Sequence, residues 1–223
     1  PDGAAGYTIP IKTPPGTAGM EPKIALSYNS RGGASPVGFG WAIAGLSTVQ
    51  RGPRNLGEDG IVRGVQIDEG DALFLDGEKL VQVDAGQAGG YREFRTRVDN
   101  YSRIRAYEWD SAGPKRMTVE TRAGLRLYFG STTASRVILP TSQKILSWLC
   151  DRIEDSVGNY ILFSYQLDGL DYKIKEILYT GNASAKLKPY AKVTFEYEKV
   201  TPYELRYIMG NRVEPSFILR KIV

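Results

Sequence analysis

The chain has 223 residues, a net charge of +4 and 42% apolar residues, values that fit a folded globular protein with a proper core. It contains no histidine and one cysteine, Cys150, which excludes a histidine general base, histidine-ligated zinc and an internal disulfide. No apolar run of about 18 residues occurs, so no membrane-spanning helix is predicted. The chain starts at Pro1 without a methionine or a signal-peptide pattern, and we therefore expect a fragment of a longer protein.

The first 60 residues are rich in turn-forming residues, holding 12 of the 25 glycines and 7 of the 12 prolines. Alternating apolar residues predict strands over 7–11 and 23–30. Between and after these strands we expect irregular, glycine-rich backbone. One continuous structure is predicted, in which the strands after residue 60 lengthen and become regular.

Two glycine motifs in this region resemble nucleotide-binding loops but are incomplete. In 33–39, Phe39 stands where a phosphate loop has its lysine, and the Gly-x-Gly at 38–40 lacks the third glycine of a dinucleotide fingerprint. We therefore interpret Gly38 and Gly40 as residues that let a strand bend or bulge where the large ring of Trp41 packs closely.

Hairpins are predicted throughout the rest of the chain. Asp76-Gly77 and Gly158-Asn159 each separate two apolar runs, and we expect positive φ at both turns. Ala123-Gly124 is the expected turn of another hairpin. The segments predicted to form strand pairs are 72–83, 117–130, 148–167, and 172–182 with 191–200. The prediction is an all-β fold in which antiparallel strands and hairpins form a curved sheet or sandwich.

Two further segments have an ambiguous pattern. Residues 142–153 show some helical character, although their apolar spacing fits a strand equally well, and Cys150 within them is expected to be a buried, inert thiol. The acidic run 68–71 lacks the spacing of a calcium loop and is interpreted as a solvated turn.

The densest basic segment, 91–109, alternates arginine with tyrosine. A strand would place Arg103, Arg105 and Tyr107 on one face together with Tyr101 and Trp109, and such a face can stack nucleic-acid bases. The alternative is a solvated sheet face on which the arginines pair with Glu93, Asp99 and Glu108. We favour the second interpretation and predict no nucleic-acid partner.

The sequence resembles the N-terminal domain of the Salmonella virulence plasmid B (SpvB) family, which also begins the B components of Tc toxins and many Rhs/YD-repeat proteins. The first 60 residues match this family densely and the remainder loosely. The residues that carry the resemblance, expected to have structural roles, are Pro15, Gly16, Gly19, Pro22, Tyr28, Asn29, Ser30, Gly38, Gly40, Trp41, Arg51, Asp76, Gly77, Gly158 and Asn159.

The resemblance implies a scaffold. It implies one SpvB-type domain over 1–223, with a signature region at 1–60, a hairpin region at 61–223 and a degenerate YD-like repeat near 155–181. The expected function is a non-catalytic domain of a large secreted bacterial toxin, part of a β-shell that encloses or delivers a C-terminal effector. Its expected partners are the downstream YD-repeat shell or effector domain of the same protein and, in addition, other toxin-complex subunits. The expected location is extracellular, after a cytoplasmic stage before export.

Two other functions stay open at this point. One is a β module that binds a carbohydrate or a cell surface through exposed aromatic rings. The other is an ADP-ribosyltransferase, because the family's namesake carries such a domain and these enzymes use a Glu-x-Glu pair, which Glu196 and Glu198 would supply. The strand that normally accompanies this pair is missing, so we expect no catalytic residue, no cofactor and no metal site.

Overall fold

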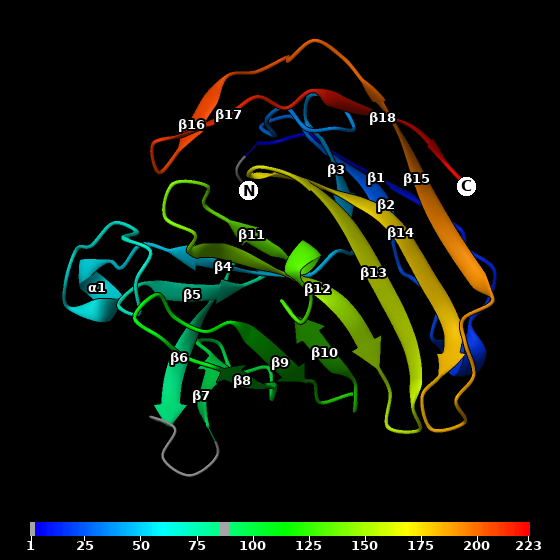
Figure 1. Cartoon of the computed structure of the whole chain (residues 1–223), viewed down its shortest axis with the longest axis horizontal. Coiled ribbons are helices and arrows are strands. Elements are labelled where there is room, and N and C mark those ends of the chain that lie inside the picture. The colour runs from blue at the N-terminus through cyan, green and yellow to red at the C-terminus, as the bar shows by residue number, and fades with distance from the viewer. Residues whose placement is uncertain (1–2, 85–89) are drawn as a thin grey trace. The chain divides into compact units, whose positions relative to one another are not determined.

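The computed structural model describes residues 3–84 and 90–223. The chain divides into two compact units, which we call the barrel unit (Ser47–Val157) and the sheet unit (Pro1–Leu46 with Gly158–Val223). Both are built from antiparallel strands, with 51% strand and 5% helix in total, so the all-β prediction is confirmed (Figure 1). Among the described residues, no helix has the length and apolar character needed to cross a bilayer.

The barrel unit is a closed barrel of eight strands. The first seven strands pair consecutively along the chain, and the eighth closes the ring by pairing with both the seventh and the first. The barrel strands are β4 (Thr48–Gly52), β5 (Ala72–Leu75), β6 (Glu78–Asp84), β7 (Tyr91–Thr96), β8 (Arg103–Tyr107), β9 (Arg116–Glu120), β10 (Arg126–Phe129) and β12 (Ile145–Glu154). The curved sheet or sandwich predicted from the sequence is therefore, in this unit, a sheet closed on itself.

Three short elements accompany the barrel. Strand β11 (Arg136–Ile138) pairs with β12 and follows the 3-10 helix η2 (Thr133–Ser135). The single-turn helix α1 (Leu56–Asp59) lies in the long connection from β4 to β5, and its first turn is capped by Asn55, whose side chain accepts a hydrogen bond from the Glu58 N–H at 3.0 Å.

Alternating apolar residues form the core of the barrel, as expected for a small barrel filled with side chains. In β8 the buried Ile104 and Ala106 alternate with Arg103, Arg105 and Tyr107, and in β9 Met117 and Val119 are buried on either side of Thr118, which is buried too. The largest fully buried side chains of this unit are Trp148, Phe129, Ile104, Met117, Leu149, Val49, Val119 and Val137. Residues 142–153, whose pattern was ambiguous, contribute β12, because Trp148 and Cys150 are drawn into this core.

The hairpin turns follow the predicted glycine positions. At the β5–β6 turn Asp76 and Gly77 have φ of 50° and 87°, and Gly124 between β9 and β10 has φ of 79°, a region that glycine enters without strain. Gly158 has φ of 90°, but Asn159 does not have positive φ, so that part of the prediction is wrong. Asn159 is instead the first, buried residue of β13, where its Oδ1 accepts a hydrogen bond from Asn182 Nδ2 at 2.8 Å.

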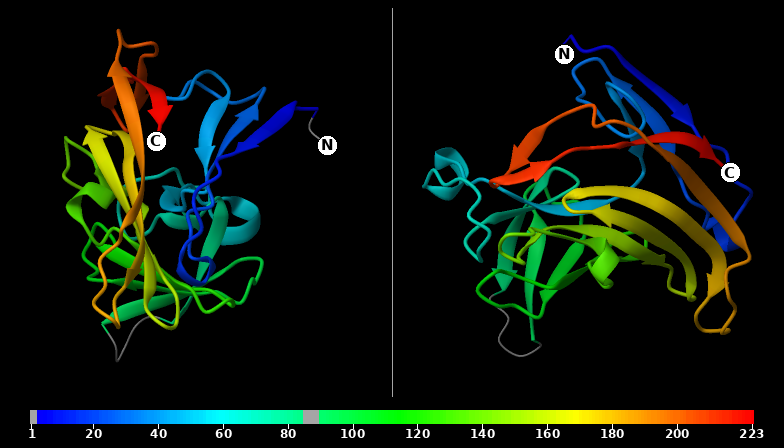
Figure 2. Two further views of the ribbon diagram at one scale, coloured as in Figure 1. Left: turned by 90° about the vertical axis from the view of Figure 1, so that its right-hand side faces the viewer. Right: turned by 45° about the horizontal axis from the view of Figure 1, so that its top comes forward.

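The sheet unit contains two main sheets, which Figure 2 shows as separate layers. One consists of β1 (Gly6–Pro10), β2 (Ala25–Asn29) and β3 (Trp41–Ala44), with the 3-10 helix η1 (Thr17–Gly19) between β1 and β2. The other contains β13 (Asn159–Asp168), β14 (Asp171–Asn182), β15 (Ala191–Lys199) and β18 (Phe217–Ile222). Strands β16 (Arg206–Ile208) and β17 (Asn211–Val213) form a separate hairpin.

Two hydrogen bonds join the N-terminal segment to the second sheet. The Tyr179 hydroxyl donates to the Pro14 carbonyl at 3.1 Å, and the Leu219 N–H donates to the Pro36 carbonyl at 2.6 Å. Tyr179 is itself fully buried, so its hydrogen bond attaches the glycine- and proline-rich N-terminal segment to the core of the sheet unit.

Candidate functional site

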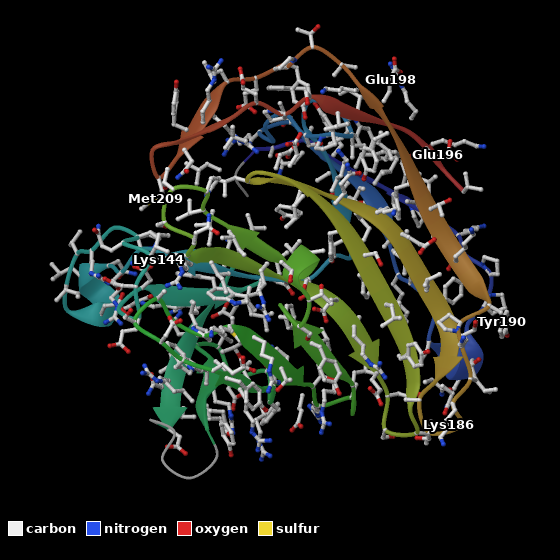
Figure 3. The ribbon with its side chains drawn as sticks, in the orientation of Figure 1. Lys144, Lys186, Tyr190, Glu196, Glu198 and Met209 are labelled. Carbon is white, nitrogen blue, oxygen red and sulfur yellow. The ribbon has the colours of Figure 1, made fainter. Side chains whose placement is uncertain are left out.

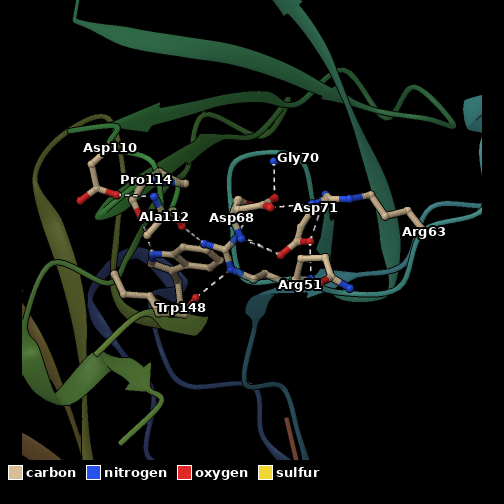
Figure 4. Close-up of polar contacts among 11 residues, drawn as sticks. Arg51, Arg63, Asp68, Gly70, Asp71, Asp110, Ala112, Pro114 and Trp148 are labelled. Atoms are coloured by element: carbon tan, nitrogen blue, oxygen red, sulfur yellow. Dashed lines mark hydrogen bonds and ion pairs between the residues drawn. The ribbon is translucent and has the colours of Figure 1, made fainter. Parts of the chain in front are cut away.

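Arg51 at the end of β4 is the centre of the most connected polar cluster of the barrel unit (Figure 4). Its side chain is 1% exposed. The guanidinium donates hydrogen bonds to the carbonyls of Ile145 at 2.8 Å, Asp68 at 2.6 Å and Ala112, and to Asp71 Oδ2 at 3.1 Å. One side chain therefore joins the loop between β4 and β5, the loop between β8 and β9 and the start of β12, which are far apart in the sequence.

Asp71 is the counter-ion of Arg51 and is equally buried, with 0% of its side chain exposed. It also accepts hydrogen bonds from the N–H groups of Gln66 at 2.8 Å and Asp68 at 3.3 Å, and it lies 3.5 Å from Arg63 Nη1. Because a buried charge is costly unless it is paired and hydrogen-bonded, this density of partners explains how the ion pair is tolerated in the interior. Burial lowers the pKa of Arg51, and the charge of Asp71 opposes this shift.

Trp148 from β12 covers the arginine. The Arg51 guanidinium lies 5.3 Å from the centre of the indole ring, and the indole N–H donates to the Pro114 carbonyl at 3.2 Å. The charges of this cluster neutralise each other, and its hydrogen bonds are made within the barrel unit.

A second ion cluster lies where α1 meets β6. The Lys79 ammonium contacts Asp59 Oδ2 at 2.6 Å and Glu58 Oε2 at 2.9 Å, and Arg97 lies 3.3 Å from Glu58 Oε1. Burial lowers the pKa of Lys79, but the hydrogen bonds to Asp59 and Glu58 raise it by more. The same bonds, with those from Asn55, hold the pKa of both carboxyls below their ordinary values.

The signature residues of the N-terminal region take backbone roles in the sheet unit. Gly40 has φ of 78°, and a Cβ placed on it would lie 2.6 Å from the Tyr28 ring and 2.9 Å from the Asn29 carbonyl oxygen. Gly38 has φ of 131°. Trp41 follows directly and packs on Tyr28 with ring centres 5.3 Å apart. Both glycines lie in the connection between β2 and β3, and the register of these two strands is regular, so the close approach of the Tyr28 ring to Gly40 is as expected but there is no bulge inside a strand.

The remaining signature residues also shape backbone. Gly16 cannot carry a Cβ without overlapping the Met20 carbonyl, and its N–H donates to Glu21 at 3.0 Å. Gly19 has φ of 77°, Pro22 is buried and Pro15 is exposed. Asn29 and Ser30 accept hydrogen bonds through their side chains from backbone N–H groups. Asp76 accepts from Ser47 Oγ and from the Thr48 N–H, which joins the β5–β6 turn to the start of β4.

The arginine- and tyrosine-rich segment is a mixed-charge face of the barrel. Glu93 lies 2.8 Å from Arg95, 3.2 Å from Arg105 and 3.8 Å from Arg103, and Glu108 lies 2.7 Å from Arg116. The predicted cross-strand pairing is confirmed for Glu93 with Arg105, whereas Glu108 pairs with Arg116, which lies outside the segment 91–109. It is wrong for Asp99, whose carboxylate accepts a hydrogen bond from the Tyr101 N–H in a turn.

The observed strand β8, Arg103–Tyr107, is shorter than the strand that the sequence predicted over 101–109. Tyr101 and Glu108 have φ of 62° and 56°, so they end the strand on either side of β8, and Tyr101 and Trp109 lie outside it. The rings of Tyr91 and Tyr107 are each covered by an arginine, Arg105 at 4.8 Å and Arg116 at 4.5 Å.

Three other residues that the sequence singled out lie apart from these clusters. Glu196 and Glu198 are both exposed on β15, and Glu198 pairs with Arg220 at 2.5 Å (Figure 3). The β15–β18 register shifts between residues 196 and 197, so simple alternation is interrupted there. Cys150 is buried, and burial raises the pKa of its thiol, as an inert cysteine requires.

Sequence reasoning identified Arg51 but missed its partners. Asp71 belongs to the acidic run 68–71, which is no solvated turn: Asp71 is buried by Arg51, and Asp68 pairs with Arg63 at 2.5 Å. The available signal was the alternation in 48–52, which places Arg51 on the same side of the strand as Val49, and a buried arginine requires an acid as its partner. In the described part of the chain, no group of three or more potential ligand residues is arranged to hold a metal ion.

The family follows from comparison with known proteins. The family model described as Salmonella virulence plasmid 65kDa B protein matches residues 1–209. The chain belongs to the SpvB family. The mono(ADP-ribosyl)transferase SpvB of Salmonella typhimurium (strain 14028s / SGSC 2262) is 27% identical over 188 residues, which cover 77% of this chain and 31% of that protein. The chain thus spans about a third of the length of the curated relatives it matches.

Solved structures share the fold. The N-terminal domain of the effector protein SpvB from Salmonella typhimurium strain LT2 has a TM-score of 0.74 at 20% identity, covering 97% of this chain and 86% of that one. A chain of the Photorhabdus luminescens Tc holotoxin pore has a TM-score of 0.80 at 19% identity, covering 100% of this chain and 13% of that one. The SpvB-family chain therefore has the fold found in both an effector and a Tc toxin.

Proposed function

We propose that this chain is a non-catalytic structural domain of a large bacterial toxin or virulence protein, and that it contributes to a β-shell that encloses or delivers a C-terminal effector. The observation that carries the proposal is the fit of the whole chain to a small part, 13%, of a Tc holotoxin chain. A domain that recurs as a minor segment of much longer toxin chains suits a role in the architecture of those chains.

The interior of the chain supports the same role. The buried ion pair of Arg51 and Asp71 is satisfied inside the barrel unit, where Arg51 also donates to the carbonyls of Asp68, Ala112 and Ile145. A closed, strand-rich structure whose charges are neutralised internally is stiff. This stiffness does not depend on a reactive side chain. The proposed partners are the downstream shell or effector portion of the same protein and other toxin-complex subunits, and the proposed location is extracellular after export.

The geometry gives less support to an ADP-ribosyltransferase role than to a structural one. Glu196 and Glu198 are exposed, Glu198 is already paired with Arg220, and none of the three pockets described in the chain is lined by either carboxylate. A carbohydrate-binding role is not favoured either, because Trp148 is buried and the half-buried rings of Trp41 and Trp109 contact Tyr28 and Phe94.

The enzymatic alternative is tested by incubating the purified chain with radiolabelled NAD and a panel of acceptor proteins. We expect no transfer of label and no release of nicotinamide above the protein-free rate. Transfer that disappears in both Glu196→Gln and Glu198→Gln would overturn the proposal. The variant Lys186→Ala, on an exposed residue of the same unit, serves as the matched control for handling and folding.

A further inference from the structure

The connection between β14 and β15, in the sheet unit, is a compact turn held by hydrogen bonds. The N–H groups of Asn182 and Leu187 each donate to the carbonyl of the other, at 3.0 and 2.8 Å. The Tyr190 N–H donates to Thr180 Oγ1 at 3.0 Å. These bonds fix the backbone of 182–190, so its exposed side chains project from defined positions.

Exposed and half-buried side chains alternate from this turn into β15. Lys188, Tyr190 and Lys192 are exposed, whereas Pro189 and Ala191 between them are half-buried. This alternation indicates extended backbone, in which residues two apart lie on the same face. The two lysines therefore flank the tyrosine ring on one face, and Figure 3 shows Tyr190 beside the start of β15.

Two strongly exposed apolar side chains belong to the same segment. Tyr190 is 83% exposed, the highest value among the large apolar side chains of the described residues, and Leu187 is 59% exposed. A single exposed apolar residue is ordinary on a protein surface, but here a leucine and a tyrosine stand beside two lysines on a fixed turn. We call Leu187, Lys188, Tyr190 and Lys192 the 187–192 surface.

The 187–192 surface is basic, and its charges have no counter-ion. Residues 177–195 contain three lysines and no aspartate or glutamate. Among the described residues neither Lys188 nor Lys192 forms an ion pair, in contrast to Lys79, which contacts two carboxylates. An anionic partner would therefore meet positive charge that the protein itself does not neutralise.

We propose that the 187–192 surface binds the headgroup region of a lipid bilayer that contains anionic lipids. Lys188 and Lys192 attract the anionic headgroups, and Leu187 and Tyr190 enter the boundary between the headgroups and the acyl chains. Tyrosine suits this boundary because its ring is apolar while its hydroxyl stays in contact with water. An acidic polypeptide matches the surface less well, because it would neutralise the lysines without burying the two apolar side chains.

Flotation of the complete chain with lipid vesicles tests the proposal. The probes are vesicles of phosphatidylcholine and phosphatidylserine in equal parts, and vesicles of phosphatidylcholine alone. We expect binding to the anionic vesicles that weakens as the salt concentration rises, and binding to the neutral vesicles that is weaker by about tenfold or more. Equal binding to both kinds of vesicle would overturn the proposal, as would capture of the chain by poly-glutamate without binding to the anionic vesicles.

The basic part of the surface is tested by the double variant Lys188→Gln with Lys192→Gln. Its matched control is Lys175→Gln with Lys199→Gln, which removes two exposed lysines elsewhere in the sheet unit. Each lysine close to an anionic bilayer strengthens binding roughly fivefold, so the first pair should weaken vesicle binding about 25-fold and the control pair by much less. Equal losses of binding in the two double variants would contradict the assignment of this surface.

The apolar part of the surface is tested by Tyr190→Ser. Its matched control is Tyr207→Ser, in the β16–β17 hairpin, where the tyrosine is 65% exposed. We expect Tyr190→Ser to weaken binding to anionic vesicles by about fivefold or more, because binding scales with the apolar area that enters the bilayer, and Tyr207→Ser to leave it unchanged. If Tyr190→Ser bound as tightly as wild type, the entry of this ring into the bilayer would be refuted.

A dye attached at position 190 locates the contact directly. Because Cys150 is buried, a cysteine introduced by Tyr190→Cys can be labelled selectively with a dye whose emission rises in an apolar environment. Addition of anionic vesicles should raise the emission of the dye at position 190 and leave that of Tyr207→Cys, labelled in the same way, unchanged. A dye at position 190 that stays in water while the protein floats with the vesicles would refute the proposal.

Discussion

Replacing Arg51 with methionine tests how much the buried ion pair contributes to the stability of the barrel unit. Methionine keeps most of the length of the side chain and removes the guanidinium, which is 1% exposed and donates to three carbonyls and to Asp71. Breaking a buried pair from one side typically destabilises a protein by about 3–5 kcal/mol, because the remaining charge stays in the interior. The three carbonyls that lose a donor add to this cost.

The lower half of that range is expected for Arg51→Met. Asp71 keeps the two N–H groups of Gln66 and Asp68 and the nearby Arg63, so it is not left without partners. We therefore predict a loss of about 3 kcal/mol in the free energy of unfolding. The change is measured by urea unfolding, followed by far-ultraviolet circular dichroism and tryptophan fluorescence, since Trp148 lies under the guanidinium.

Arg126→Met is the matched control. Arg126 lies 2.8 Å from Glu120, but the two side chains are 54% and 30% exposed. Pairs of this kind contribute about 0–1 kcal/mol. If Arg51→Met lost no more stability than Arg126→Met, the view that the Arg51 cluster holds the loops of the barrel together would be refuted.

Three further predictions follow from the same geometry. Gly40→Val should destabilise the chain by more than about 2 kcal/mol, because the added Cβ overlaps the Tyr28 ring at positive φ. Gly33→Ala, at a glycine with open space around it, should be nearly neutral, and urea unfolding measures both variants. Trp148→Ala should lower the free energy of unfolding by about 3–5 kcal/mol, because its ring is fully buried, and Trp41→Ala by roughly half of that, because its ring is half-buried. Equal losses of unfolding free energy in the two variants would contradict this difference in burial. The two carboxyls paired with Lys79 have lowered pKa values, so their contribution is present above their unfolded pKa of about 4 and is lost as the pH falls through the folded value. The free energy of unfolding should therefore fall less between pH 6 and pH 3 in Lys79→Met than in wild type. The same fall in both proteins would contradict the pairing of Lys79 with Glu58 and Asp59.

The features that the sequence predicted correctly are those decided by neighbouring residues. Asp76-Gly77 and Gly124 were placed at turns because only certain residues adopt positive φ cheaply, and the structure has positive φ at all three. Alternation in the sequence likewise places Ile161, Phe163 and Tyr165 on one side of β13, and all three are buried.

The features that were missed depend on contacts between distant segments. Closure of the barrel requires β10 to pair with β12, and nothing local in 126–129 specifies that partner. The same holds for Arg51 and Asp71, which are 20 residues apart and meet only because the β4–β5 connection folds back. Trp41 was expected to pack closely, and it contacts Tyr28 but is only half-buried, whereas Trp148 occupies the core, because burial is decided by which strands pack together.

A structure of the complete parent protein by electron cryomicroscopy tests the proposed function most directly. If the chain is a structural part of a toxin shell, its strands should be continuous with the wall of that shell and well ordered in every particle. Residues 1–223 should also make their contacts mainly with the downstream portion of the same protein. If residues 1–223 were instead joined to the downstream portion only by a flexible linker, without packing against it, the proposal would be contradicted.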